Sequence, residues 1–295
     1  MKRTLPTLLP FLALLVPAAA GGARAEDAIG TLPPARCQEL RDTGVLTDAN
    51  PVPCERLRSV RFEHPTMAGA ALAQGELVVL DVLAEQTLAL MQRLRARSFP
   101  IARAQAMEAF EGDDAASMRA NNSSAFNGRA ITGGGRWSMH AYGVAIDVNP
   151  VQNPYIALEA DGTARVRPRR SARHAVNRLE TRVGKAPRPG MVEPVVLEFA
   201  RHGFYRWGGD WDYPIDYQHF ELGSRPFVEA LVVLGPAQAR RELATVAARF
   251  DACIGEDAEP LGSRRQRCAG EAIEWMDERA AALPRSREPG GPGAP

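Results

Sequence analysis

The segment from Ser138 to Asp147 constrains this chain more than any other. It places His140 in a glycine-bearing turn, and Asp147 seven residues later, inside a short apolar run. A carboxylate among aliphatic side chains loses its hydration and is unfavourable there unless a cation compensates it. A salt bridge to an arginine is one solution. Metal ligation is the other, and it accounts for both residues together.

A second histidine, His219, lies in a segment of alternating character, and Asp216 precedes it by three residues. Two imidazoles and one carboxylate leave one position open around a tetrahedral ion, and Zn²⁺ suits this ligand set best. Water on such an ion has a pKa of about 7, and Asp216 is placed to accept its proton and return it to a leaving amine. We predict one zinc ion held by His140, Asp147 and His219 in a hydrolase. Asp216 is the predicted catalytic acid and base, with an ordinary turn residue as the alternative.

The pattern Ser-x-His-x-x-Gly-x-Ala-x-Asp, followed by Asp-x-x-His, resembles the M15 family of zinc D-Ala-D-Ala carboxypeptidases and L-alanyl-D-glutamate endopeptidases. The resemblance covers about residues 100–222. It implies peptidoglycan stem peptides as substrates and an α+β fold like that of Hedgehog and the D,D-peptidases, in which helices flank a small antiparallel sheet that carries the zinc site. The aspartate at position 216 is similar to that of the endopeptidase and endolysin branch.

One position departs from the family. Its members often place an arginine after the strand that leads into the active-site loop, where it stabilises the oxyanion, but here Phe110 is followed by acidic residues and glycine. We expect Arg119, and after it Arg129, to take this role, with stabilisation mostly by the zinc alone as the alternative. Ser138 is expected to bind the oxyanion or orient a ligand, with a turn hydroxyl as the alternative. The expected substrate groove is formed by Arg129, Tyr142 and Trp211, with core packing as the alternative for the two aromatic residues.

The first residues have the basic start, apolar stretch and small-x-small cleavage site of a secretory signal peptide. We therefore expect an exported, periplasmic or secreted protein that acts as a monomer, without stable membrane insertion. A formal net charge of +1 gives no general signal for nucleic acid. The expected organisation is a signal peptide (1–25), an N-terminal arm (26–64), a zinc peptidase domain (65–235), a C-terminal helical pair (236–283) and a disordered tail (284–295).

The four cysteines form two local groups, and export permits disulfides between them. Four cysteines allow three connectivities. A metal site is the weaker interpretation, because neither group has a short Cys-x-x-Cys spacing. We favour local pairing of Cys37 with Cys54 and of Cys253 with Cys268, the second of which would join two C-terminal helices.

Hydrophobic periodicity and turn residues predict the remaining elements. Residues 155–188 are expected to be an irregular insert. Its part from 165 to 188 holds nine Arg or Lys residues and one acid, which indicates a solvated basic face or contact with an anionic polymer such as cell-wall material. The predicted helices are 77–97, 192–202, 236–252 and 264–283; the predicted strands are 101–110, 144–148, 204–207 and 217–222; and 111–136 is a predicted loop.

Two other functions fit the same residues. A non-catalytic zinc-containing protein that binds peptidoglycan or another envelope component would keep the ligands without turnover. A calcium-stabilised secreted module is the weaker alternative, because two histidines disfavour a hard cation. The residues do not choose between a carboxypeptidase and an endopeptidase.

Overall fold

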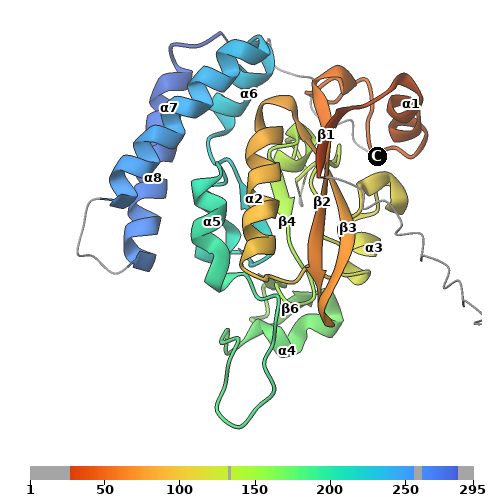
Figure 1. Ribbon diagram of the computed structural model, residues 1–295, viewed down its shortest axis with the longest axis vertical. Coiled ribbons are helices and arrows are strands. Elements are labelled where there is room, and N and C mark those ends of the chain that lie inside the picture. Colours follow the sequence, from red (N-terminus) through yellow and green to blue (C-terminus); the bar gives the residue numbers. More distant parts are fainter. Residues whose placement is uncertain (1–26, 132–133, 256–260, 285–295) are drawn as a thin grey trace, which may run out of the picture.

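The computed structural model describes residues 27–131, 134–255 and 261–284. Within these ranges, helices surround three antiparallel sheets of three strands each, so the chain has a mixed α+β fold (Figure 1). The expected signal peptide and residues 285–295 of the expected tail lie outside the described residues. None of the described helices is both long and apolar enough to cross a membrane.

The first sheet is built by the N-terminal part of the chain, in the order β1 (Ala28–Thr31), β2 (Leu57–Thr66) and β3 (Gly69–Leu80). Helix α2 (Ala84–Ala96) packs against it, and Val60 and Leu77 join this helix in one apolar core. The boundary expected at residue 64 falls inside β2. The helix predicted from residue 77 begins too early, because residues 77–80 pair with β2. A short apolar run suits a strand or a helix, and the pairing decides between them.

The second sheet has the order β4 (Ala145–Asp147), β9 (His219–Glu221) and β7 (Arg206–Trp207), which confirms the three short strands predicted here. Its core side chain is Phe220, which stacks on Phe199 and on Trp207. Phe199 belongs to α5 (Val196–Arg201), which follows the short 3-10 helix η6 (Glu193–Val195). The helix predicted over 192–202 is thereby confirmed.

Two strands of the third sheet lie in the segment 155–188, which was expected to be irregular, so that expectation was wrong. The order of this sheet is β6 (Ala164–Arg167), β5 (Tyr155–Leu158) and β8 (Ile215–Asp216). The pairing of β5 with β8 is long-range and leaves no local sequence signal. The short helices η5 (Arg169–Ser171) and α4 (Ala172–Ala175) follow β6.

The strand predicted over 101–110 is also wrong: this stretch holds one bridge, Ala104 to Ser123, and the 3-10 helix η3 (Met107–Phe110). The predicted loop after it contains α3 (Asp114–Arg119), and residues 121–127 are buried. Polar side chains tolerate this burial because they are hydrogen-bonded. The amide of Asn122, for example, accepts from the Gln105 backbone N–H and donates to its carbonyl.

Three helices complete the C-terminal part: α6 (Arg225–Val233), α7 (Pro236–Gly255) and α8 (Leu261–Ala280), as Figure 1 shows. The last two confirm the predicted helical pair, and the Cys253–Cys268 disulfide joins them. The other disulfide links Cys37 on α1 (Pro34–Asp42) to Cys54 on η1 (Cys54–Arg56). Both local pairings are confirmed.

A glycine holds the site-bearing turn against the first sheet. Gly143 ends the 3-10 helix η4 (Met139–Tyr142) with a φ of +67°, and its carbonyl accepts from Leu80 N–H at 2.9 Å. A Cβ at this position would lie 2.7 Å from the Leu80 nitrogen. The close approach of η4 to β3 therefore depends on glycine.

Gly143→Ala is expected to destabilise the fold through both the positive φ and the contact with β3. Gly135→Ala is the matched control, because Gly135 has a φ of +84° and open space around its Cβ position. The control should lose about 1–2 kcal/mol in the free energy of unfolding, from the backbone conformation alone. Gly143→Ala should lose about 1–3 kcal/mol more, from the contact. Urea unfolding measures both, and equal losses would contradict the role given to this contact.

Candidate metal centre

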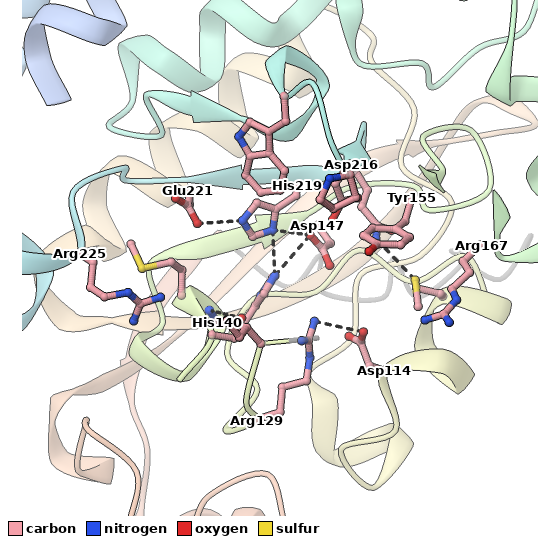
Figure 2. A pocket seen from close by; sticks show the side chains of 17 residues that line it. Asp114, Arg129, His140, Asp147, Tyr155, Arg167, Asp216, His219, Glu221 and Arg225 are labelled. Carbon is pink, nitrogen blue, oxygen red and sulfur yellow. Dashed lines mark hydrogen bonds and ion pairs between the residues drawn. The ribbon is translucent and has the colours of Figure 1, made fainter. Parts of the chain in front are cut away.

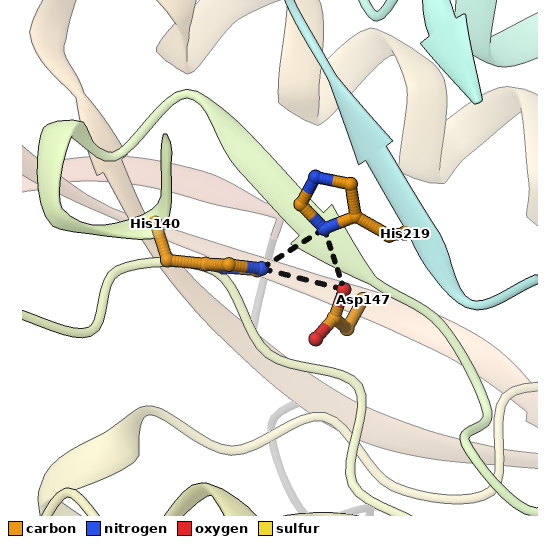
Figure 3. A group of neighbouring side chains, drawn as sticks. All are labelled: His140, Asp147 and His219. Carbon is orange, nitrogen blue, oxygen red and sulfur yellow. Dashed lines mark hydrogen bonds and ion pairs between the residues drawn. The ribbon is translucent and has the colours of Figure 1, made fainter. Parts of the chain in front are cut away.

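Three buried side chains converge where η4 meets the second sheet (Figure 3). Asp147 on β4 and His219 on β9 are direct partners in the antiparallel register, and His140 reaches them from η4. His219 Nδ1 lies 3.1 Å from Asp147 Oδ1, His140 Nε2 lies 3.2 Å from His219 Nδ1, and His140 Nε2 lies 3.3 Å from Asp147 Oδ1. We call these three residues the triad.

Hydrogen bonds on the outer side of the triad determine which ring nitrogens carry protons. His140 Nδ1 donates to the carbonyl oxygen of Ala125 at 2.6 Å, since a carbonyl only accepts. His219 Nε2 faces the carboxylate of Glu221 at 3.0 Å and donates to it. When both rings are neutral, as metal ligation requires, they turn lone pairs toward the Asp147 carboxylate. Three acceptors facing one another need a cation between them.

The dimensions of the triad fit a tetrahedral ion. Nitrogen and oxygen ligands lie about 2.0–2.2 Å from zinc, which separates two ligand atoms by about 3.3–3.5 Å at a tetrahedral angle. The triad separations of 3.1–3.3 Å are slightly shorter than this. Two imidazoles and one carboxylate favour zinc over calcium, which prefers oxygen ligands. The triad is therefore a candidate zinc site with one position open toward the pocket.

The histidines and carboxylates of the site stabilise one another's charged forms. Burial alone would lower the pKa of His219, but the hydrogen bonds to Asp147 and Glu221 outweigh burial and raise it to about 10. Burial would raise the pKa of Asp147, but the charges of the two histidines and the hydrogen bonds to them hold it well below its usual range. The site thus stabilises a positive charge at its centre.

The triad lies in a pocket of about 320 Å³ that also contains Asp216 (Figure 2). Asp216 is on β8 of the third sheet, so the pocket lies where the second and third sheets meet. Its Oδ1 is buried, with no hydrogen-bond partner among the described residues. Burial, and next the negative charge of Asp147, raise the pKa of Asp216 to about 8. The pocket thus contains a carboxyl group that is suited to holding a proton near neutral pH.

The structure brings three of the other predicted residues to this pocket. Ser138 caps η4, and its Oγ accepts from His140 N–H at 3.3 Å. The ring of Trp211 is centred 5.4 Å from that of His219. Arg129 lines the pocket as well and forms an ion pair with Asp114 at 3.1 Å.

Two predicted residues do not reach the pocket. The side chain of Arg119 is 64% exposed and lies 3.7 Å from Asp113, on the outside of α3. The preference for Arg119 over Arg129 is therefore wrong. Tyr142 is buried and its hydroxyl donates to Glu229 at 3.2 Å, so core packing describes this residue better than a groove wall.

Sequence reasoning missed several residues of the pocket. Glu221 follows His219 by two positions, so strand alternation places both on one face, and this signal was available. Tyr155 and Arg167 come from the third sheet, and no local pattern indicates that sheet. Arg225, at the start of α6, also lines the pocket and was not among the predicted site residues.

Comparison with known proteins identifies one region of the chain. Residues 132–222 match a family model described as D-alanyl-D-alanine carboxypeptidase. The match spans just under a third of the chain and includes the whole triad and Asp216. No curated protein and no solved structure gives a significant match.

Zinc binding near neutral pH should release at least one proton, that of His219, and Asp216 should add to the release because the ion lowers its pKa. Metal-free His219 is protonated below a pKa of about 10, and a ligating imidazole must be neutral, so the ion displaces that proton. The affinity should therefore increase as pH rises from 7 and level off above the pKa. Titration calorimetry in buffers of different ionisation enthalpy measures the release. Binding without proton release would contradict the charge state given to the triad.

Glu221→Gln should weaken zinc binding about 10- to 100-fold, because the carboxylate orients His219 and makes it more basic. Glu159→Gln is the control: Glu221 pairs with Arg206 at 3.3 Å and Glu159 pairs with Arg165 at 2.8 Å, but Glu159 lies outside the pocket. Competition with a chromogenic chelator gives both dissociation constants. An unchanged value for Glu221→Gln would show that this contact does not support the ligand.

Proposed function

We propose that this chain, whose residues 132–222 match the D-alanyl-D-alanine carboxypeptidase family model, is an M15-type zinc-dependent peptidase that hydrolyses amide bonds in peptidoglycan stem peptides. The observation that carries the proposal is the pairing of two features in one pocket. Three lone pairs converge on a cation position, and a buried carboxyl group without a partner lies beside them.

His140, Asp147 and His219 are the proposed ligands of one zinc ion. A zinc ion held there supplies a Lewis acid that polarises the scissile carbonyl and makes water a nucleophile near neutral pH. Hydrogen bonds within the chain orient the two histidine ligands. Ser138 Oγ accepts from the His140 backbone, and the outer nitrogens of both rings are held by Ala125 and Glu221.

Asp216 is the proposed general base and acid. In the free protein its raised pKa keeps a proton on the carboxyl group at neutral pH, and the positive charge of a bound ion would lower that pKa. The carboxylate then takes a proton from the attacking water and returns it to the leaving amine. Its unpartnered Oδ1 leaves it ready for both transfers.

Arg129 and Trp211 are the proposed substrate contacts. We propose that Arg129 stabilises the oxyanion, because it lines the pocket and Arg119 does not. Trp211 offers an apolar wall beside His219, against which a substrate side chain can pack. Tyr155 and Arg167, from the third sheet, line the pocket together with these residues.

The same proposal covers the setting of the enzyme. We propose a Hedgehog/D,D-peptidase-like domain that extends to residue 235 and is followed by the helical pair; a start at residue 65 is not retained, because that position lies inside β2. Two disulfides within the chain are compatible with export to the periplasm or the medium after removal of residues 1–25. We also propose that the protein acts on peptidoglycan peptides as a monomer and has no role in nucleic-acid binding.

Incubation of zinc-loaded protein with purified muropeptides tests this function. Mass analysis of the products should show loss of a terminal D-alanine or cleavage within the stem peptide, and the mass change identifies the bond. Zinc binding without any cleavage would favour the non-catalytic wall-binding alternative instead.

Asp216→Asn should lower kcat/KM on the cleaved muropeptide by about 10²- to 10⁴-fold, since the amide cannot accept the proton. Zinc content should remain at the wild-type level, because Asp216 is outside the proposed ligand set. Asp212→Asn, an exposed position in the preceding turn, is the matched control. Retained activity in Asp216→Asn would remove this residue from the mechanism.

A further inference from the structure

A cluster of cationic side chains, separate from the proposed zinc pocket, lies in the segment that follows α4. Residues 176–188, here called the basic loop, project from the body of the protein below α4 in Figure 1. Nine of the 36 Lys and Arg residues of the chain lie between 165 and 188, against one acid, Glu180. The proposed peptidase chemistry uses none of the basic loop.

Arginines hold the basic loop in one shape. The Arg188 guanidinium donates to the carbonyls of Arg173 at 3.0 Å and Leu179 at 2.8 Å, and also to that of Asn177. Near the start of the loop, Arg178 pairs with Glu193 at 2.6 Å, and its guanidinium lies 4.3 Å from the centre of the Tyr217 ring. A loop held in this way presents its other side chains in a fixed arrangement.

A pocket of about 330 Å³ opens against this loop, and its cationic lining residues are Arg173, Arg182 and Arg188. No acidic residue is among the described residues that line it. The Nε atoms of Arg182 and Arg188 are buried, with no hydrogen-bond partner in the described part of the chain. Buried donors of this kind are costly unless a ligand accepts from them. The pocket is thus built for an anion that offers several oxygens.

The electrostatic surroundings agree with an anion site. His174 lines the same pocket, and burial, followed by the charges of Arg173 and Arg188, lowers its pKa to about 4. Burial, followed by the charges of Arg182 and Arg178, likewise lowers the pKa of Arg188. The positive charges repel one another here, so an anion that neutralises them is stabilised.

Aliphatic side chains on the same loop identify the kind of anion. Val176 is 73% exposed, Leu179 is 61% exposed and Val183 is fully exposed. Contact with a hydrophilic anionic polymer would leave these three aliphatic side chains, which lie within eight positions, without an apolar partner. Beside cationic residues, they match the interfacial zone of a bilayer, where apolar side chains enter the acyl boundary and cations meet phosphates.

We propose that the basic loop docks the protein on anionic phospholipid. A headgroup phosphate accepts hydrogen bonds in the pocket of Arg173, Arg182 and Arg188, and Val176, Leu179 and Val183 enter the interface. This attachment is peripheral and would keep the enzyme close to a membrane surface while the zinc pocket acts on its substrate. The docking does not require the proposed peptidase activity.

Sedimentation of the protein with vesicles tests this docking. The protein should bind vesicles of phosphatidylglycerol and phosphatidylcholine, bind pure phosphatidylcholine much more weakly, and be released by high salt. Arg182→Gln should weaken binding to the anionic vesicles about fivefold, as expected for one cation at the surface. Val183→Asp should weaken it at least as much, and full exposure of Val183 means that the fold should not change.

Two controls keep the test specific. Arg240→Gln removes an exposed arginine from α7, and Leu72→Asp places a charge at an exposed aliphatic position on β3; both should bind vesicles like wild type. Equal binding to both kinds of vesicle, or equal binding by loop variants and controls, overturns the proposal. So does saturable binding of inorganic phosphate or of purified peptidoglycan sacculi by a protein that does not bind vesicles.

Discussion

Three lone pairs that face one another in a buried space form the constraint on which the site depends. His140 Nε2, His219 Nδ1 and Asp147 Oδ1 lie within 3.3 Å of one another, and their outer hydrogen bonds leave no donor between two neutral rings. Such an arrangement is stable only around a positive charge, which a proton provides in part and a metal ion provides fully. The surrounding fold holds these atoms together against their mutual repulsion.

Each part of the fold supplies one piece of that restraint. The antiparallel register places Asp147 opposite His219, and η4 brings in His140 through the close contact between Gly143 and β3. The third sheet adds Asp216 from a different direction, although only three residues separate it from His219. Ligand and proton-transfer groups are therefore close in sequence yet independently positioned.

Much of this site could be predicted from the sequence, because its motifs are local. A carboxylate within an apolar strand, and histidines at a turn and on an alternating strand, indicate a metal site without knowledge of the fold. The long-range features could not be found in this way. The pairing of β5 with β8 leaves no local pattern in the sequence. The apolar run at 77–80 suits a strand as well as a helix, so the sequence does not show that it pairs with β2 and that α2 begins after it. The sequence position of Arg119 suggests a role at the pocket, but α3 directs its side chain outward, where it is exposed.

The central claim is that the triad binds one zinc ion, and anomalous diffraction at the zinc absorption edge tests it most directly. Crystals of the zinc-loaded protein should show one anomalous peak about 2.0–2.2 Å from His140 Nε2, His219 Nδ1 and Asp147 Oδ1. The peak should leave one coordination position facing Asp216. A zinc peak elsewhere in the molecule, with the triad closed by direct hydrogen bonds, would contradict the account.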